Sequence, residues 1–200
     1  MVARARGVGA HHDERRREIA EAVLAVVAEG GLAAVSLTTV ASRAGVSAGR
    51  VQHYFRTKAD LVEAAFERGG AFSAARIRDR VDVQDLSQAD PRSVLTVVLG
   101  ELLPYDDASR AHLRVRHFFN AQALADTAIA DRVRALYAGL HEDLADLILQ
   151  TGASTTDRAR QTAVRLTAIV EGLAYYVLIG ACDLNEAQQQ LSAELSALPG

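Results

Sequence analysis

The 200-residue sequence has little cysteine and little proline, and each shortage excludes a structural feature. The single cysteine, Cys182, leaves no internal disulfide framework and no cysteine-based zinc site. Only three prolines are present, so few positions would interrupt a helix. Because alanine and leucine are abundant and alternating β-branched runs are few, the composition predicts an all-α protein.

Long apolar runs are also scarce. The longest run, from Leu166 to Cys182, is shorter than a membrane span requires and carries Glu171 in its middle. The N-terminal residues are basic, but the polar residues 11–14 follow them instead of an apolar stretch, so we expect no secretory signal. Half of the residues are hydrophobic and 24% are charged, which is typical of a soluble globular protein. We therefore expect a cytoplasmic protein that makes no contact with a membrane.

Positive charge is concentrated in the first 60 residues, although the formal net charge of the whole chain is −3. This segment contains nine lysines and arginines against six aspartates and glutamates, and the rest of the chain is acidic. Because local potential governs binding to a polyanion more than net charge does, the basic end is a candidate nucleic-acid-binding region. An ordinary solvated surface explains this imbalance equally well when it is taken alone.

Hydrophobic periodicity predicts about nine helices. Residues 1–12 lack such periodicity, and we expect them to form a flexible basic arm. Residues 82–92 are polar and are expected to form a loop, with Pro91 suited to the first turn of the next helix. We expect a helix-turn-helix domain at 13–72 and a second domain at 73–200. The expected helices lie at about 13–29, 37–44, 48–55, 58 to the early eighties, 92–103, 107–124, 127–150, 156–181 and 185–197.

The segment 37–56 has the form of a helix-turn-helix, in which the second helix enters the DNA major groove. Two short helices flank Gly45-Val46-Ser47, and apolar residues at 40, 41, 46, 51 and 55 form a kernel that fixes the angle between them. Gly49 permits close approach to DNA, and Arg50 can make a bidentate contact with guanine or phosphate. The candidate DNA-contacting residues are small or hydrogen-bonding, namely Thr38, Thr39, Ser47, Ala48, Gly49, Arg50, Gln52, His53 and Tyr54.

The next helix begins with a capping pattern, Thr57-Lys58-Ala59-Asp60, whose threonine and aspartate side chains can satisfy free backbone amides. Lys58 lies in the first turn, where an ammonium group and free amides together suit a phosphate. We therefore add Lys58 to the candidate DNA contacts.

The run from Ser36 to Leu61 resembles the DNA-binding domain of the TetR family of transcriptional regulators. The residues that carry this resemblance are Ala44, Gly45, Val46, Ser47, Gly49, Val51, Tyr54, Phe55, Thr57, Lys58 and Leu61. The likeness is close from Ile19 to the start of the fourth helix, and beyond it extends only to helix order and length. Gln52 stands where most members have a tyrosine that touches the DNA backbone, so no relative's operator sequence can be carried over.

The resemblance implies a homodimer held together by the last two long helices. Its two recognition helices would lie about 34–36 Å apart and read a palindromic operator in double-stranded DNA. It also implies a small-molecule effector that binds in the second domain, shifts the fourth helix and releases the operator, so a repressor is expected. Such an effector must bind the DNA-incompetent state more tightly than the other.

The second domain offers candidate effector contacts, because ligand pockets combine apolar walls with a few polar groups. The candidates are His112, Arg116, Phe119, Gln122, Tyr137, Glu171 and Tyr175. An aromatic residue among them is also well suited to ordinary core packing.

Neither metal binding nor catalysis has a motif in this sequence. His112 and His117 are five residues apart, off the spacing that favours two ligands on one helix, and no hydrolase, phosphate-loop or zinc-protease pattern occurs. We expect no metal, no cofactor and no enzymatic activity. An effector-independent nucleoid or division factor on the same fold is the alternative, and ligand-dependent DNA affinity would distinguish the two.

Overall fold

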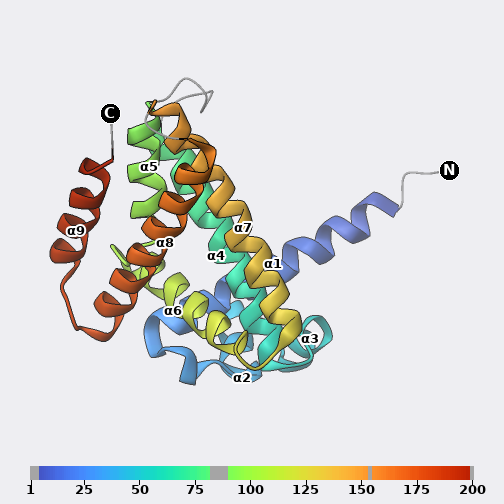
Figure 1. The fold of residues 1–200 in the computed structure, drawn as a ribbon. Coiled ribbons are helices and arrows are strands. Elements are labelled where there is room, and N and C mark those ends of the chain that lie inside the picture. Colours follow the sequence, from blue (N-terminus) through green and yellow to red (C-terminus); the bar gives the residue numbers. More distant parts are fainter. Residues whose placement is uncertain (1–4, 82–89, 153–154, 199–200) are drawn as a thin grey trace.

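The computed structural model describes residues 5–81, 90–152 and 155–198, and it confirms the all-α prediction, with no strand in these ranges. Figure 1 shows α2 and α3 at one end of the molecule, α5 and α9 at the other, and α4 running between them. The helices are α1 (Ala5–Gly30), α2 (Leu37–Ala44), α3 (Ala48–Tyr54), α4 (Lys58–Val81), α5 (Pro91–Gly100), α6 (Asp107–Gln122), α7 (Thr127–Gln150), α8 (Thr156–Ile179) and α9 (Leu184–Ser196), with a short 3₁₀ helix, η1, at Leu32–Ala34.

Two apolar cores organise these helices. The first joins α1, α2, α3 and the N-terminal half of α4, and α6 adds Ala111 and Val115 to it. The second joins α5, α7, α8 and α9 around leucines such as Leu95, Leu144 and Leu166, which are fully buried. Helices α4 and α6 pack on each other and thus connect the end that carries α2 and α3 with the rest of the bundle.

Helix α1 begins earlier than the sequence predicted. The expected flexible arm at 1–12 is wrong for residues 5–12, which continue the helix, and residues 1–4 lie outside the described part. No proline interrupts this stretch, and an ion pair between Arg15 and Glu18 bridges one helical turn. Figure 1 shows the N-terminal part of α1 projecting from the body of the molecule.

Other helix ends follow their capping residues. Asp90 accepts a hydrogen bond from the Ser93 amide, and Pro91 occupies the first turn of α5 as expected. The expected loop at 82–92 lies outside the described residues except for its last three positions. Helix α5 ends at Gly100 instead of 103, because the chain turns there and buries Leu102 and Leu103.

Helix α8 is longer than the apolar run seen in the sequence. By length and composition alone its 24 residues could cross a membrane, a property that the shorter run from Leu166 to Cys182 did not indicate. In this fold α8 packs against α7 and α9, and it carries Glu171, which forms an ion pair inside the bundle. Core helices of soluble proteins pass the same test of length and composition.

Candidate DNA interface and buried polar cluster

Local capping sets the geometry of the helix-turn-helix. At the start of α2, the Ser36 amide donates to Thr39 Oγ1 at 2.9 Å and the Thr39 amide donates to Ser36 Oγ at 3.1 Å. Gly45 then ends α2 with φ 64°, a left-handed conformation that glycine adopts without strain. Ser47 caps α3 by accepting a hydrogen bond from the Arg50 amide at 3.2 Å.

The predicted kernel holds the two helices together. Val40, Val51 and Phe55 are fully buried and Ala41 nearly so, while Val46 is partly buried against the same cluster. The opposite side faces solvent, so most of the predicted DNA contacts lie on an exposed surface. The exposed residues are Thr38, Thr39, Ser47, Ala48, Gly49, Arg50, Gln52, His53 and Lys58, whereas Tyr54 is half-buried.

Two of these residues have internal partners. The Thr39 hydroxyl donates to the Ala34 carbonyl oxygen at 2.7 Å, in addition to its part in the cap. Lys58 Nζ donates to the Leu32 carbonyl oxygen at 2.9 Å, which ties α4 to η1. Lys58 thus joins two elements, a role that the sequence did not indicate, and two of its three ammonium hydrogens remain for other acceptors.

The predicted capping box at the start of α4 is present. The Asp60 amide donates to Thr57 Oγ1 at 3.1 Å, and the Thr57 amide donates to Asp60 Oδ2 at 3.0 Å. Burial works to raise the pKa of Asp60, but hydrogen bonds from Thr57 and the Arg56 amide outweigh it and hold the pKa below its usual value. The carboxylate stays ionised and fixes the first turn of α4.

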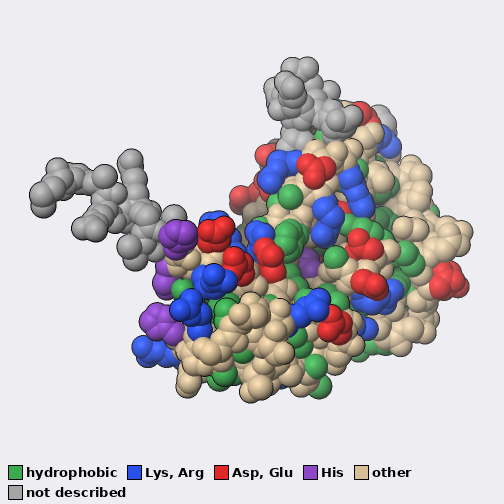
Figure 2. All heavy atoms as spheres, turned by 180° about the vertical axis from the view of Figure 1, so that it is seen from behind, with side chains coloured by type: hydrophobic (Ala, Val, Ile, Leu, Met, Phe, Trp, Pro, Cys, Tyr) green, Lys and Arg blue, Asp and Glu red, His purple; other side chains and the backbone are tan. Residues whose placement is uncertain are grey.

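Helix α1 lies beside the end of the recognition helix, which the sequence did not reveal. The His12 ring is 4.7 Å from the Tyr54 ring, and the Arg16 guanidinium lies 5.0 Å from the centre of the Phe55 ring. Figure 2 shows Lys, Arg and His side chains gathered at the end of the molecule next to the N-terminal segment. Sequence reasoning missed the contact of His12 because it treated residues 1–12 as a separate arm, and it placed Arg16 in the first helix without predicting its contact with Phe55.

A second set of predicted residues meets inside the bundle. Arg116 on α6 is buried and forms an ion pair with Glu171 on α8. The Arg116 guanidinium lies 5.5 Å from the centre of the Tyr137 ring on α7. Asn120 Nδ2, one turn along α6, donates to the Tyr137 hydroxyl at 2.9 Å. We call Arg116, His117, Asn120, Tyr137, Glu171 and Tyr175 the polar cluster, because the His117 ring also lies 5.8 Å from the Tyr175 ring.

Several polar atoms of the cluster have no hydrogen-bond partner, although they are buried. They are Arg116 Nε, His117 Nε2 and Asn120 Oδ1, and the Arg116–Glu171 contact itself lacks hydrogen-bond alignment. Burial lowers the pKa of His117, and Arg116 lowers it further while Glu171 opposes them. Burial and Glu171 raise the pKa of Tyr137. The cluster therefore presents unpaired donors and acceptors in an otherwise apolar setting, which is costly unless a ligand or water pairs them.

The other predicted effector residues lie elsewhere. His112 faces α4, where its Nδ1 is 3.3 Å from Ser73 Oγ, and Phe119 stacks on Phe66 of α4 with ring centres 4.6 Å apart. Gln122 is exposed at the end of α6. Asn120 was missed, although its spacing of four residues from Arg116 places both on one face of a helix.

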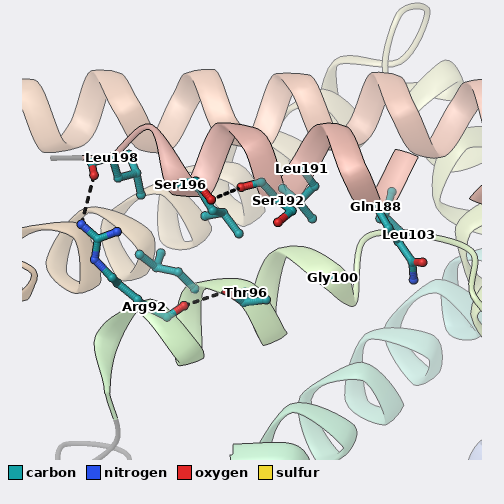
Figure 3. Close-up of a pocket in the computed structure, with 11 residues that line it drawn as sticks. Arg92, Thr96, Gly100, Leu103, Gln188, Leu191, Ser192, Ser196 and Leu198 are labelled. Atoms are coloured by element: carbon teal, nitrogen blue, oxygen red, sulfur yellow. Dashed lines mark hydrogen bonds between the residues drawn. The ribbon is translucent and has the colours of Figure 1, made fainter. Parts of the chain in front are cut away.

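Two recesses in the described part of the chain are lined by residues outside the cluster. Figure 3 shows one of about 440 Å³ between α5 and α9, where Arg92 Nη2 donates to the Leu198 carbonyl oxygen at 3.0 Å. No predicted effector residue lines it. Another, of about 280 Å³, lies between α1, α4 and α6, with Phe72 and His112 in its wall.

Comparison with known proteins identifies this arrangement. Residues 19–65 match the domain described as "Bacterial regulatory proteins, tetR family". Residues 91–200, more than half of the chain, match the domain described as "BetI-type transcriptional repressor, C-terminal". The chain belongs to the TetR family of bacterial transcriptional regulators. TetR-family proteins bind DNA through their helix-turn-helix, and α2 and α3 form that motif in this chain.

Individual relatives agree with this TetR-family assignment. The regulator PksA of Bacillus subtilis is 28% identical over 181 residues, which is 88% of this chain and 84% of PksA. The crystal structure of a Rhodococcus transcriptional regulator, 28% identical, has a TM-score of 0.75 over 92% of this chain and 95% of that one. A regulator from Saccharomonospora viridis, solved in complex with choline, has the same fold, with 24% identity and a TM-score of 0.78 over 92% of this chain and 97% of that one.

Proposed function

We propose that this TetR-family protein is a cytoplasmic repressor that binds a palindromic operator as a homodimer and leaves it when a small molecule binds the polar cluster. One observation carries the proposal: unpaired polar atoms are buried in α6, within the part of the chain that packs on α4. Helix α4 begins directly after the recognition helix, so a displacement at the cluster has a physical route to the DNA-binding face. We place the DNA-binding domain at 13–72 and the effector domain at 73–200.

The route from cluster to DNA runs through the contact of α6 with α4. Phe119 and Phe66 stack there, and His112 meets Ser73 about two turns away along each helix. A ligand that draws Arg116 or Asn120 into new hydrogen bonds shifts the side chains on the same helix. Since packed interfaces change between discrete arrangements, a small shift of α6 can move α4 as a unit.

Dimerisation is supported by an apolar strip on α8. Large apolar side chains are exposed there at Val164 (45%), Tyr175 (48%), Tyr176 (52%) and Ile179 (58%). Clustered exposed apolar residues mark an interaction surface, and a second copy of α8 would cover this strip. A dimer through the last helices places two recognition helices on one operator.

The effector needs only a moderately higher affinity for the DNA-incompetent arrangement than for the DNA-binding one. An effector releases the operator if it binds the DNA-incompetent arrangement more tightly, and typical coupling free energies are about 1–3 kcal/mol. The effector must lower the affinity for DNA by the same factor by which DNA lowers the affinity for the effector.

Selection of genomic DNA fragments by the purified full-length protein tests the proposal. We expect one or a few palindromic sites. The affinity for these sites should fall when substrates or products of the enzymes encoded by neighbouring genes are added. Many scattered, weakly related sites that no ligand affects would contradict it and would favour the chromosome-organising alternative.

A further inference from the structure

We infer that Arg116 determines which ligands the polar cluster accepts: its guanidinium is a built-in cation, so the ligand is an uncharged molecule that carries both a hydrogen-bond acceptor and a donor. The inference rests on the proposed effector role of the cluster. It names the chemical class of that effector and the residue that selects it.

A cationic ligand would need the two partners that Arg116 already holds. Protein sites for ammonium ligands combine a counter-charge with the face of an aromatic ring. Here the carboxylate of Glu171 is paired with the Arg116 guanidinium, and the Tyr137 ring lies 5.5 Å from that same guanidinium. The Arg116 residue is 6% exposed, so it cannot turn to solvent without a change of packing.

Within the cluster the one guanidinium and the one carboxylate balance each other. Arg116 and Glu171 compensate each other, burial keeps His117 neutral by lowering its pKa, and burial keeps Tyr137 neutral by raising its pKa. A second positive charge would lie beside a buried guanidinium with only one carboxylate for both. Moving Arg116 away instead would leave a buried charge unpaired, which is strongly unfavourable.

The unpaired atoms define what the ligand must offer. Arg116 Nε can only donate, Asn120 Oδ1 can only accept, and His117 Nε2 can do either, depending on its tautomer. A hydroxyl, amide or phenol group supplies an acceptor and a donor without adding charge. The ring of Tyr137 suits an apolar portion of the same molecule.

A pair of probes with the same shape tests this charge selection. Choline and its uncharged isostere 3,3-dimethylbutan-1-ol are titrated into the full-length protein by calorimetry, with wild type and Arg116→Met side by side. In wild type we expect no preference for choline. In Arg116→Met, where Glu171 is left without its cation, we expect choline affinity to exceed that of the alcohol by about tenfold or more.

Two further variants show that charge is the cause. Adding Glu171→Gln to Arg116→Met removes the carboxylate, so the gain of choline binding is expected to disappear. Arg114→Met, on the same helix but outside the cluster, is the matched control and should behave as wild type.

Arg116→Met leaves the buried Glu171 carboxylate unpaired and can fail to fold. The variant that removes the other charge of the pair is therefore also measured. In Glu171→Gln, Arg116 lacks its anion, and we expect the carboxylate 3,3-dimethylbutanoate to bind about tenfold more tightly than the alcohol. The inference is overturned if wild type prefers choline about tenfold, or if neither single variant changes the charge preference. Calorimetry measures ligand binding without DNA. The repressor function is therefore rejected by a different result, namely that the protein does not bind an operator or is not released from it by a ligand.

Discussion

His112 lies where α6 crosses α4 at Gly69. A Cβ atom at position 69 would lie 2.1 Å from His112 Cδ2, so only glycine permits this approach of the two helices. The imidazole is buried, and its Nδ1 is 3.3 Å from Ser73 Oγ. Burial and the nearby Arg116 and Arg76 guanidinium groups together lower the pKa of His112 to about 4. The folded protein therefore holds His112 neutral.

This histidine makes stability depend on pH. In the unfolded chain this side chain is protonated below about pH 6.5. In the folded chain it is protonated only below about pH 4. Its stabilising contribution is thus complete above pH 6.5 and is lost as pH falls. Between pH 6.5 and 5 we expect the free energy of unfolding to drop by about 2 kcal/mol from this group. Urea titrations of wild type and His112→Gln at several pH values measure this drop in the free energy of unfolding. If that free energy depends equally on pH in both proteins, the prediction is wrong. The exposed His53→Gln is the control.

Arg50 is exposed on α3 within the DNA-binding face, and its backbone amide is held by Ser47 Oγ at 3.2 Å. If its guanidinium reads a base, Arg50→Ala should weaken binding to the selected operator by about 1–3 kcal/mol and relax specificity at one position. Fluorescence anisotropy at fixed salt measures both. Arg158→Ala, an exposed arginine on α8, should leave affinity unchanged, and equal affinities across operator variants for Arg50→Ala and wild type would remove this role.

The sequence was more informative about the DNA face than about the interior. Turn residues such as Gly45 and Ser47 fix the local geometry, so the exposed side of α3 could be predicted from spacing alone. The contacts of His112, Phe119 and Gln122 depend on how α6 is rotated against α4 and α7. Nothing local to α6 sets that rotation, so the sequence did not reveal that Arg116 is buried while Gln122 is exposed.

At the scale of elements, one buried carboxylate holds the C-terminal half of α4. Glu101, in the connection from α5 to α6, is 2% exposed. Its oxygens lie 3.0 Å from both Arg76 Nε and Arg80 Nη1, and the Tyr105 hydroxyl donates to it at 2.6 Å. Burial and this hydrogen bond to Glu101 raise the pKa of Tyr105 to about 12. The network ties α4 to the connection at the end remote from DNA.

Removing the charge of Glu101 should loosen this attachment. In Glu101→Gln the buried carboxylate that both arginines contact is lost, and because the arginine side chains are partly exposed we expect the free energy of unfolding to fall by about 1–3 kcal/mol. Thermal and urea unfolding measure the loss. The exposed Glu142→Gln on α7 should change stability little, and a loss in Glu101→Gln no larger than in that control would show that the network contributes nothing.

Helix positions were predictable because each helix carries its own start and stop signals. Helix α7 has Asp126 as a cap and α2 ends at Gly45, and both were placed at the correct residues. The boundary at Ala5 was missed because Asp13 and Glu14 are residue types that favour a helix start, yet the helix continues on their N-terminal side. The short helix η1 was also missed, because three residues are too few for a periodic pattern.

At the scale of the whole molecule, the apolar strip on α8 would be exposed to water in a monomer, which is unfavourable. Tyr175, Tyr176 and Ile179 lie within about one turn of one another and are each about half exposed. The second core uses the opposite side of α8, through residues such as Leu166 and Val170, so both sides of the helix are apolar. A helix that is apolar on all sides needs cover on all sides, and a second copy of α8 provides it.

Tyr176→Asp places a charge in the middle of this strip. A carboxylate is costly to bury, so the variant should be monomeric in multi-angle light scattering while its helical circular dichroism is unchanged. The monomer reads one half-site only, and its affinity for the palindromic operator should therefore fall well below that of wild type. Leu124→Asp adds the same charge at an exposed leucine outside α8 and should remain dimeric. If Tyr176→Asp instead remains a dimer with full operator affinity, the interface lies on another surface, and the two recognition helices must be spaced by other contacts.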